Sequence, residues 1–156
     1  MHASSLTRAP GFSLVDQKGR VRTLTDFLAH GRLLLNFHRG TWCPNCRLQF
    51  RLLAENIATY TALGIQAVGV LAQDRASVRR YIEETGLPFD ILVDERRDML
   101  KAYGVWHRAG LDAWNIARPA VFLIEQDGRI SYSFIGDSQR EYPTQEEILA
   151  MLNAEC

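Results

Sequence analysis

Two cysteines separated by two residues are the most reactive feature of the sequence. Cys43 and Cys46 follow an apolar run over 32–37 that predicts a buried strand, and a helical pattern begins at the pair itself. Residues three apart lie on one face of the first helical turn, so the two sulfurs can form a disulfide. The free N–H groups at a helix start stabilise a thiolate over a thiol. We therefore expect two-electron dithiol chemistry.

Three neighbours are candidates to support the pair. Pro44 suits the first helical position, because its φ is already helical and its missing N–H would have no partner there. Trp42 is expected either to shield the pair and shape the surface that a substrate meets, or only to pack. Arg39, with His38 before it, follows the predicted strand and either tunes the thiolate, contacts a substrate carboxylate or has a structural role.

Basic residues gather around the pair. Residues 1–78 carry nine Lys or Arg and four Asp or Glu, a balance of +5, and residues 79–156 carry nine and fourteen, a balance of −5. The window 27–54 has no acidic residue and holds four arginines: Arg32, Arg39, Arg47 and Arg51. This pattern fits a solvated basic face that pairs with the second half of the chain, and it equally fits a positive field around a thiolate.

A Cys-x-x-Cys pair is also half of a common zinc site. The sequence has three cysteines and four histidines but no second spaced pair, so it offers little to complete such a site. Two inert buried thiols are a further alternative, which the coincidence of strand, pair and helix disfavours. Cys156 at the last position is interpreted as an incidental thiol. We expect neither a metal nor an organic cofactor.

Length and composition predict one domain over residues 1–156. The chain has 47% hydrophobic residues and a net charge of zero. No apolar run approaches the roughly 20 residues that cross a bilayer, and the first residues lack the apolar core of a signal peptide. Because nucleic acid and anionic membranes attract a basic surface, neither is expected as a partner. These features favour a cytoplasmic protein.

Strand and helix patterns alternate along the chain. We expect strands over 12–15, 21–24, 32–37, 65–71, 89–93, 120–124 and 130–134. Helices are expected over 46–60, after Asp74, over 98–103 and after a capping box at 144–147. Residues 106–118 show no periodicity and are interpreted as a functional loop or lid. This order predicts an α/β fold, a mixed sheet with helices on both faces.

Motifs along most of the chain carry a family resemblance. They are residues 9–14 (APGFSL), 35–46 (LNFHRGTWCPNC), 87–94 (LPFDILVD), 102–105 (AYGV) and 119–124 (PAVFLI). In this order they resemble the thioredoxin-fold superfamily, in its peroxiredoxin-like branch of the alkyl hydroperoxide reductase and thiol-specific antioxidant type. The resemblance implies a thioredoxin-like three-layer α/β/α sandwich with an N-terminal hairpin and an inserted βα unit.

The departures from the family pattern bear on mechanism. If Cys46 takes the place of the family's peroxidatic cysteine, Cys43 stands in its threonine slot and Arg39 in its proline slot. In the later hairpin Pro119 occupies the slot of the peroxide-binding arginine, and Arg118 lies one residue early, which turns its side chain to the opposite face. Pro119 instead resembles the cis-proline that thioredoxins place beside their cysteine pair, where it offers backbone to an extended substrate.

Three functions therefore stay open. The first is a thiol-disulfide oxidoreductase in which Cys43 attacks and Cys46 resolves. The second is a thiol peroxidase in which Cys46 attacks peroxide and Cys43 resolves. The third is a non-catalytic binding module on the same fold. For the two enzymes the implied partners are a disulfide or peroxide substrate and a thiol donor such as thioredoxin or glutathione. The oligomeric state is left open.

Overall fold

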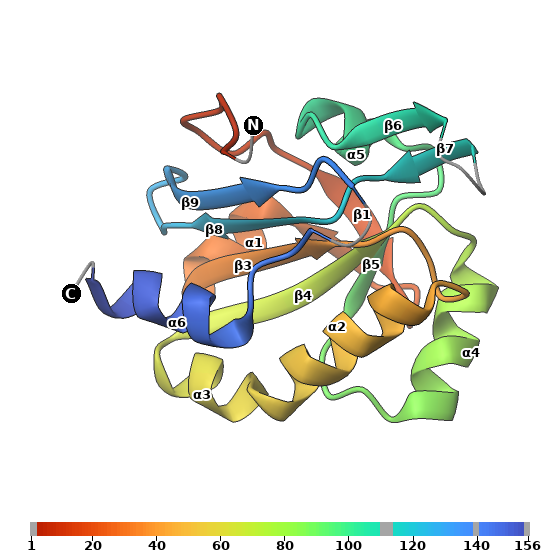
Figure 1. Ribbon diagram of the computed structural model, residues 1–156, viewed down its shortest axis with the longest axis horizontal. Helices are drawn as coiled ribbons and strands as arrows, with labels where there is room; N and C mark the ends of the chain where they lie inside the picture. Colours follow the sequence, from red (N-terminus) through yellow and green to blue (C-terminus); the bar gives the residue numbers. More distant parts are fainter. Residues whose placement is uncertain (1–2, 110–113, 139–140, 155–156) are drawn as a thin grey trace.

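A seven-stranded mixed sheet forms the middle of the molecule (Figure 1). The computed structural model describes residues 3–109, 114–138 and 141–154. The strand order is β2-β1-β5-β4-β3-β8-β9, in which β3, β4 and β5 run parallel and the other neighbours antiparallel. The strands are β1 (Ser13–Asp16), β2 (Val21–Thr23), β3 (Arg32–Phe37), β4 (Ile65–Leu71), β5 (Ile91–Val93), β8 (Ala120–Ile124) and β9 (Ile130–Ile135).

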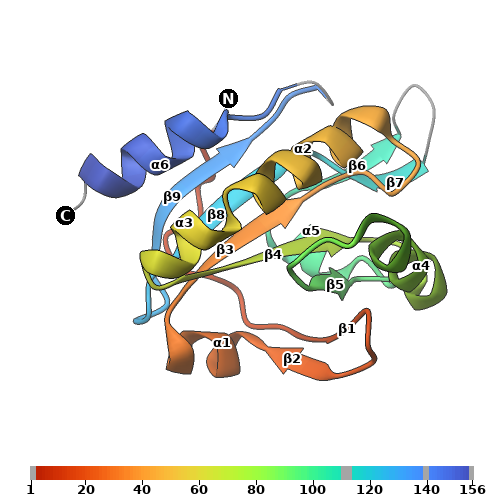
Figure 2. The ribbon, with the colours of Figure 1, turned by 90° about the horizontal axis from the view of Figure 1, so that it is seen from below.

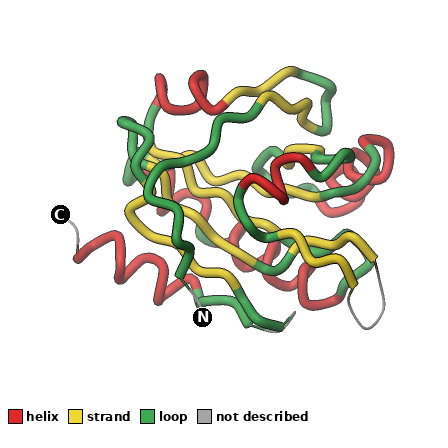
Figure 3. Tube along the Cα trace, turned by 90° about the horizontal axis from the view of Figure 1, so that it is seen from above, coloured by secondary structure: helices red, strands yellow, loops and turns green. Residues whose placement is uncertain are grey.

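Helices cover both faces of this sheet. One face carries α2 (Pro44–Glu55), α3 (Ile57–Ala62), α4 (Arg75–Thr85) and α6 (Gln145–Ala154), which lie in front in Figure 2. The other face carries α1 (Leu24–His30) and α5 (Asp98–Ala102). A separate two-stranded sheet of β6 (Trp106–Ala109) and β7 (Trp114–Ala117) lies on the side of α5 (Figures 1 and 3). The expected three-layer arrangement is confirmed.

The central strand β3 divides the core by alternation. Leu34 packs with α2, α3, α4 and α6, whereas Leu33, Leu35 and Phe37 pack with α1 and α5. Strands β3 and β4 begin and end where their apolar runs predict, because both are fully flanked in the sheet and covered on both faces. The C-terminal end of β3 therefore has a fixed position, from which the cysteine loop departs.

Three sequence predictions are wrong in detail. The strand expected over 21–24 ends at Thr23, and residues 24–30 form the helix α1, which was not predicted. Thr23 caps this helix, because its hydroxyl accepts the Asp26 N–H at 3.1 Å. The helix expected over 46–60 is interrupted at Asn56, whose side-chain amide donates to the Leu52 carbonyl at 2.9 Å. The stretch 106–118 is not irregular, because β6 and β7 pair there with Trp106 opposite Ala117. Residues 110–113 of that stretch lie outside the described residues.

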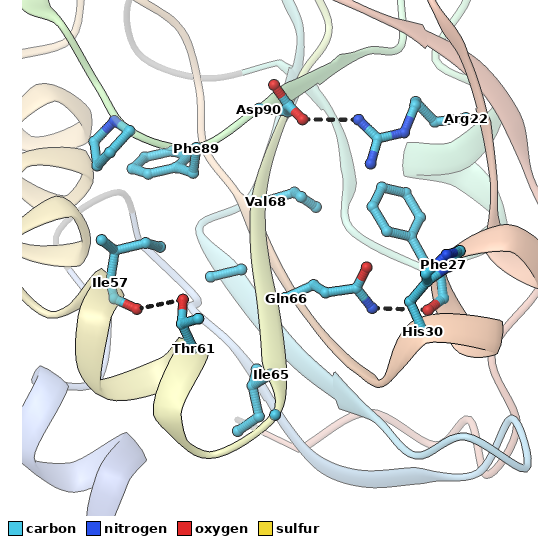
Figure 4. Close-up of a pocket in the computed structure, with 13 residues that line it drawn as sticks. Arg22, Phe27, His30, Ile57, Thr61, Ile65, Gln66, Val68, Phe89 and Asp90 are labelled. Atoms are coloured by element: carbon cyan, nitrogen blue, oxygen red, sulfur yellow. Dashed lines mark hydrogen bonds and ion pairs between the residues drawn. The ribbon is translucent and has the colours of Figure 1, made fainter.

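A group of ion pairs anchors β5 to the N-terminal hairpin. Asp16 is fully buried and accepts hydrogen bonds from Arg20 Nε at 2.8 Å and Arg22 Nη1 at 3.1 Å. Arg22 Nη1 also donates to Asp90 at 2.7 Å, at the rim of a hollow of about 390 Å³ beside the start of β4 (Figure 4). Since the cysteines follow the opposite end of β3, this hollow lies away from them.

Among the described residues, no helix combines the length and the apolar character that crossing a membrane requires.

Candidate active site

The cysteine pair sits where the loop after β3 enters α2. Cys43 is the N-cap residue of this helix, with an extended backbone, and Pro44 is its first helical residue as expected. The Sγ atom of Cys43 accepts the backbone N–H of Cys46 at 3.4 Å, so the thiol takes the place that a serine or aspartate oxygen holds in other helix caps. The structure thus places the two cysteines together at a helix start.

The surroundings of Cys43 favour its thiolate. Arg39 Nη2 donates to Cys43 Sγ at 3.2 Å. Burial alone would raise the pKa of Cys43, but hydrogen bonds from the Cys46 thiol, the Cys46 N–H and Arg39 outweigh burial and lower this pKa below its ordinary value. Arg39 is therefore placed to tune the thiolate, as one of its expected roles required.

The surroundings of Cys46 favour its thiol. Burial, and next the hydrogen bond with Cys43, raise the pKa of Cys46 to about 12. Hydrogen bonds from the backbone of Gly40 and Arg39 act in the opposite direction and are too weak to cancel burial. The pair thus holds one acidic and one protonated sulfur, which share a proton through their mutual hydrogen bond. Both residues are only 1% exposed.

The loop between β3 and α2 is fastened on both sides. Gln73, which follows β4, accepts the Thr41 N–H through Oε1 at 2.7 Å and donates through Nε2 to the Thr41 hydroxyl at 3.2 Å. From α2, Arg47 donates to the Thr41 carbonyl at 2.7 Å. The sequence analysis missed Gln73, because a lone polar residue after a strand carries no signal of its partner. These bonds hold the loop that carries Arg39.

Trp42 forms the outer surface of this loop. Its ring lies under the Arg39 guanidinium, 4.8 Å from Cζ to the ring centroid, and the residue is 50% exposed. A Cβ atom at Gly40 would meet the Trp42 ring at 2.9 Å, so a larger residue there would displace the indole. Arg39 therefore connects the exposed indole to the buried Cys43 sulfur.

The buried His38 side chain lies at the start of the loop that carries the cysteines. His38 packs edge-on against Phe50, with ring centroids 4.7 Å apart, and at a tilt against Tyr142, with ring centroids 4.8 Å apart. Its Nδ1 has no hydrogen-bond partner in the described part of the chain, and burial lowers its pKa to about 3, so the ring is neutral at pH 7. The Tyr142 hydroxyl donates to Oδ1 of buried Asn36. The sequence analysis missed Tyr142, because it lies more than 100 positions from Asn36 along the chain.

Pro119 lies at the same end of the sheet, but the expected cis bond is wrong. Its peptide bond is trans, and the residue is buried just before β8, whose Ala120 pairs with Phe37. The Pro119 carbonyl accepts the Gly136 N–H at 2.8 Å, and the Arg118 N–H donates to Val105 at 2.7 Å. The backbone groups expected to hold a substrate therefore already have hydrogen-bond partners within the protein. Pro119 here is a trans proline directly before an ordinary strand.

The Arg118 side chain does not reach the cysteines in the described structure. Its guanidinium donates to the Asp137 carbonyl at 3.4 Å, and the residue lines a hollow with Tyr103 and Ile135 on the α5 side. This position agrees with the expected alternation of Arg118 and Pro119.

Cys156 lies outside the described residues. Within those residues, no group of three or more His, Cys, Asp or Glu side chains could hold a metal ion.

Comparisons with known proteins agree with this geometry. The sequence model of the AhpC/TSA family matches residues 6–133. Thiol-disulfide oxidoreductase ResA of Geobacillus thermodenitrificans is 31% identical over 134 residues, which cover 85% of this chain and 70% of that protein. Peroxiredoxin Bcp of Escherichia coli K12 is 30% identical over 128 residues, 81% of each chain. The crystal structure of peroxidoxin BcpB from Mycobacterium tuberculosis has a TM-score of 0.84 at 19% identity, covering 99% of this chain and 97% of that one. The thioredoxin-like fold is confirmed.

Proposed function

We propose that this chain, which belongs to the AhpC/TSA family, is a thiol-disulfide oxidoreductase in which Cys43 attacks a substrate disulfide and Cys46 resolves the product. Its relatives are enzymes of thiol redox chemistry, which disfavours the non-catalytic alternative. The observation that carries the proposal is the contrast between the two sulfurs. Cys43 has a lowered pKa beside Arg39, and Cys46 has a pKa raised to about 12.

The first step is attack by the Cys43 thiolate. It forms a bond to one substrate sulfur, the substrate S–S bond breaks, and the second substrate sulfur leaves as a thiolate. Once Cys43 is in the mixed disulfide, its negative charge no longer raises the pKa of Cys46. The Cys46 proton then passes to the departing thiolate, and backbone groups of Gly40 and Arg39 stabilise the new Cys46 thiolate.

The second step forms the disulfide between Cys43 and Cys46. The Cys46 thiolate attacks Cys43 Sγ, the mixed disulfide breaks, and the remaining substrate sulfur leaves as a thiolate that takes a proton from water. The substrate gains two electrons, and the protein ends with a Cys43–Cys46 disulfide. A thiol donor such as thioredoxin or glutathione returns the two electrons. Because Cys43 is 1% exposed, the cycle requires the Arg39 and Trp42 side chains to move when a substrate enters.

The proposal includes the setting of the reaction. The pair acts without a metal or an organic cofactor, since the thiolate itself is the nucleophile. The cytoplasm is the proposed location, because thiol donors there keep dithiols reduced. Neither nucleic acid nor a membrane is proposed as a partner.

Single replacements of the cysteines test the proposal. Cys43→Ser should abolish reduction of a neutral disulfide such as 2-hydroxyethyl disulfide. Cys46→Ser should accumulate a mixed disulfide on Cys43, because the resolving thiol is missing, and mass spectrometry of the intact variant detects the adduct. Full turnover by Cys43→Ser, or an adduct on Cys46 in that variant, would contradict the assignment of the nucleophile.

A thiol peroxidase is the second candidate. The observation that favours it is the pair of backbone hydrogen bonds from Gly40 and Arg39 to Cys46, together with the similarity to peroxiredoxin Bcp. Cys46 would attack hydrogen peroxide, gain one oxygen as sulfenic acid and release water, and Cys43 would condense with it to a disulfide and a second water. A sulfenic acid trapped on Cys46 in Cys43→Ser would support this reaction.

A further inference from the structure

A groove between α2 and α4 adjoins the cysteine pair. It encloses about 500 Å³, and its lining residues are Pro44, Arg47, Leu48, Arg51, Tyr81, Thr85 and Leu87. The lining residues from α2 recur at intervals of three and four, so they form one stripe along the helix. This stripe starts at Pro44, directly after Cys43. Figure 1 shows α4 beside the first turns of α2. The groove thus leads away from the reactive sulfur along the helix.

The charge of this groove is positive and uncompensated. Arg47 and Arg51 both line it, and no acidic residue does. Neither arginine forms an ion pair with a carboxylate among the described residues. Arg51 is exposed, and the first acidic residue of α2 is Glu55, at its last position. An arginine that has no carboxylate partner favours a carboxylate as its ligand.

The Arg47 side chain is already held in place. It donates to the Thr41 carbonyl at 2.7 Å, and its Cζ lies 4.8 Å from the centre of the Tyr81 ring. Tyr81 is 3% exposed, so it forms the buried floor under this arginine. A side chain fixed in this way loses little conformational entropy when a ligand binds.

One exposed apolar side chain lines the groove, and another follows Thr41, whose carbonyl accepts a hydrogen bond from Arg47. Leu48 is 37% exposed beside the arginines, and Trp42 is 50% exposed next to Cys43. Large exposed apolar side chains that border uncompensated charge are typical of surfaces that bind another protein. The groove is therefore suited to a ligand that combines apolar side chains with carboxylates.

We propose that this groove docks an extended acidic segment of a partner protein, the segment that flanks the partner's reactive cysteine. The inference rests on the proposed function and names the substrate class of the same site. Charge complementarity with Arg47 and Arg51 selects the acidic segment, and Trp42 and Leu48 contact its apolar side chains.

Helix geometry sets the spacing of the carboxylates. A helix rises 1.5 Å per residue, so Arg47 lies about 6 Å and Arg51 about 12 Å along α2 from Cys43. An extended segment rises about 3.3 Å per residue, which places the matching acidic residues about two and about four positions from the partner's cysteine. These two positions share one face of an extended chain, so both carboxylates can face α2 together.

Peptide disulfides with designed charges test the inference. The acidic peptide carries aspartate at the second and fourth positions on each side of its cysteine. A control peptide of otherwise identical sequence carries lysine at these positions. For the native protein we expect kcat/KM to be about 5- to 10-fold higher with the acidic peptide, the size of one or two partly screened charge pairs. Arg51→Glu should abolish or reverse this preference, and Arg51→Gln should reduce it.

Controls separate docking from chemistry. Arg79→Glu reverses an exposed charge on α4 outside the groove and should leave the peptide preference unchanged. The ratio of kcat/KM for the acidic peptide to kcat/KM for uncharged 2-hydroxyethyl disulfide should fall in Arg51→Glu and keep its native value in Arg79→Glu. The inference is overturned if the native protein shows no preference, if Arg79→Glu acts as strongly as Arg51→Glu, or if oxidised glutathione shows the same dependence on Arg51 as the acidic peptide. Failure of the native protein with the neutral disulfide would instead contradict the proposed function.

Discussion

At the residue scale, two identical side chains acquire opposite properties from their places on one helix turn. Cys43 occupies the N-cap, where the Cys46 N–H and Arg39 point at its sulfur. Cys46 is one turn further in, where burial dominates and the sulfur keeps its proton. The sequence predicted the pair, its helix start and Arg39 as a candidate to tune the thiolate, but the hydrogen bonds from Cys46 and the 3.2 Å contact with Arg39 are shown only by the folded loop.

Replacing Arg39 tests the origin of this contrast. Arg39→Met removes the charge and keeps much of the side-chain volume, so the pKa of Cys43 should rise relative to the native protein. The thiolate fraction at pH 7 should therefore fall. The measurement is the rate of Cys43 alkylation by iodoacetamide as a function of pH, with the modified site identified by mass spectrometry.

The midpoint of this pH profile is the informative quantity, because it reports the pKa of Cys43, whereas the plateau reports how accessible the sulfur is. Arg79→Met, which removes an exposed charge from α4, serves as the control and should give the native midpoint. An unchanged or lower midpoint in Arg39→Met would rule out Arg39 as the group that stabilises the thiolate.

At the element scale, strong local patterns predicted the strands that position the site. The apolar runs of β3 and β4 have only one stable place, the middle of a sheet. Elements that depend on tertiary contacts were missed. The α1 helix buries mainly Leu24 and Phe27, and the β6–β7 pair shows no alternation that a sequence pattern detects. The bonds of Gln73 and Tyr142 join segments far apart in the chain, so no local pattern contains them.

The short strand β5 depends on charge as well as on packing. Burial alone would raise the pKa of Asp16 and of Asp90, but hydrogen bonds from Arg22 and its neighbours lower both. A lowered folded-state pKa adds stability above the unfolded value of about 3.9, and this stability is lost as the pH falls through the folded value. The native protein should therefore lose unfolding free energy below about pH 4.

Arg22→Met isolates this contribution. It leaves buried Asp16 with one fewer donor, so we expect a loss of about 1–3 kcal/mol of unfolding free energy at pH 7. The difference from the native protein should shrink as the pH falls toward 2, because protonation of the carboxylates weakens their bonds to Arg22. Urea unfolding at both pH values measures it, with Arg96→Met at an exposed pair as the control. A difference that does not depend on pH would assign the effect to packing instead.

At the scale of the whole molecule, one fold carries both the disulfide and the peroxide chemistry of its relatives. The order of motifs was enough to predict the family and the fold, which the AhpC/TSA match and the structural similarity confirm. The departures from the family pattern also proved informative. Arg118 lies away from the cysteines, while Arg39 donates to Cys43 Sγ. The cis geometry of Pro119 was wrong, because family resemblance does not determine a peptide bond.

The measurement that tests the account most directly compares two oxidants on the fully reduced protein. Stopped-flow fluorescence follows oxidation by an acidic peptide disulfide and by hydrogen peroxide, with Trp42 next to Cys43 as the reporter. A Trp42→Phe variant, which lacks this reporter, shows which part of the fluorescence change comes from Trp42. The account predicts rapid oxidation by the disulfide and a peroxide rate like that of a free thiol. A peroxide rate orders of magnitude above a free thiol, with slow reaction of the disulfide, would contradict Cys43 as the attacking residue and make Cys46 the peroxidatic cysteine.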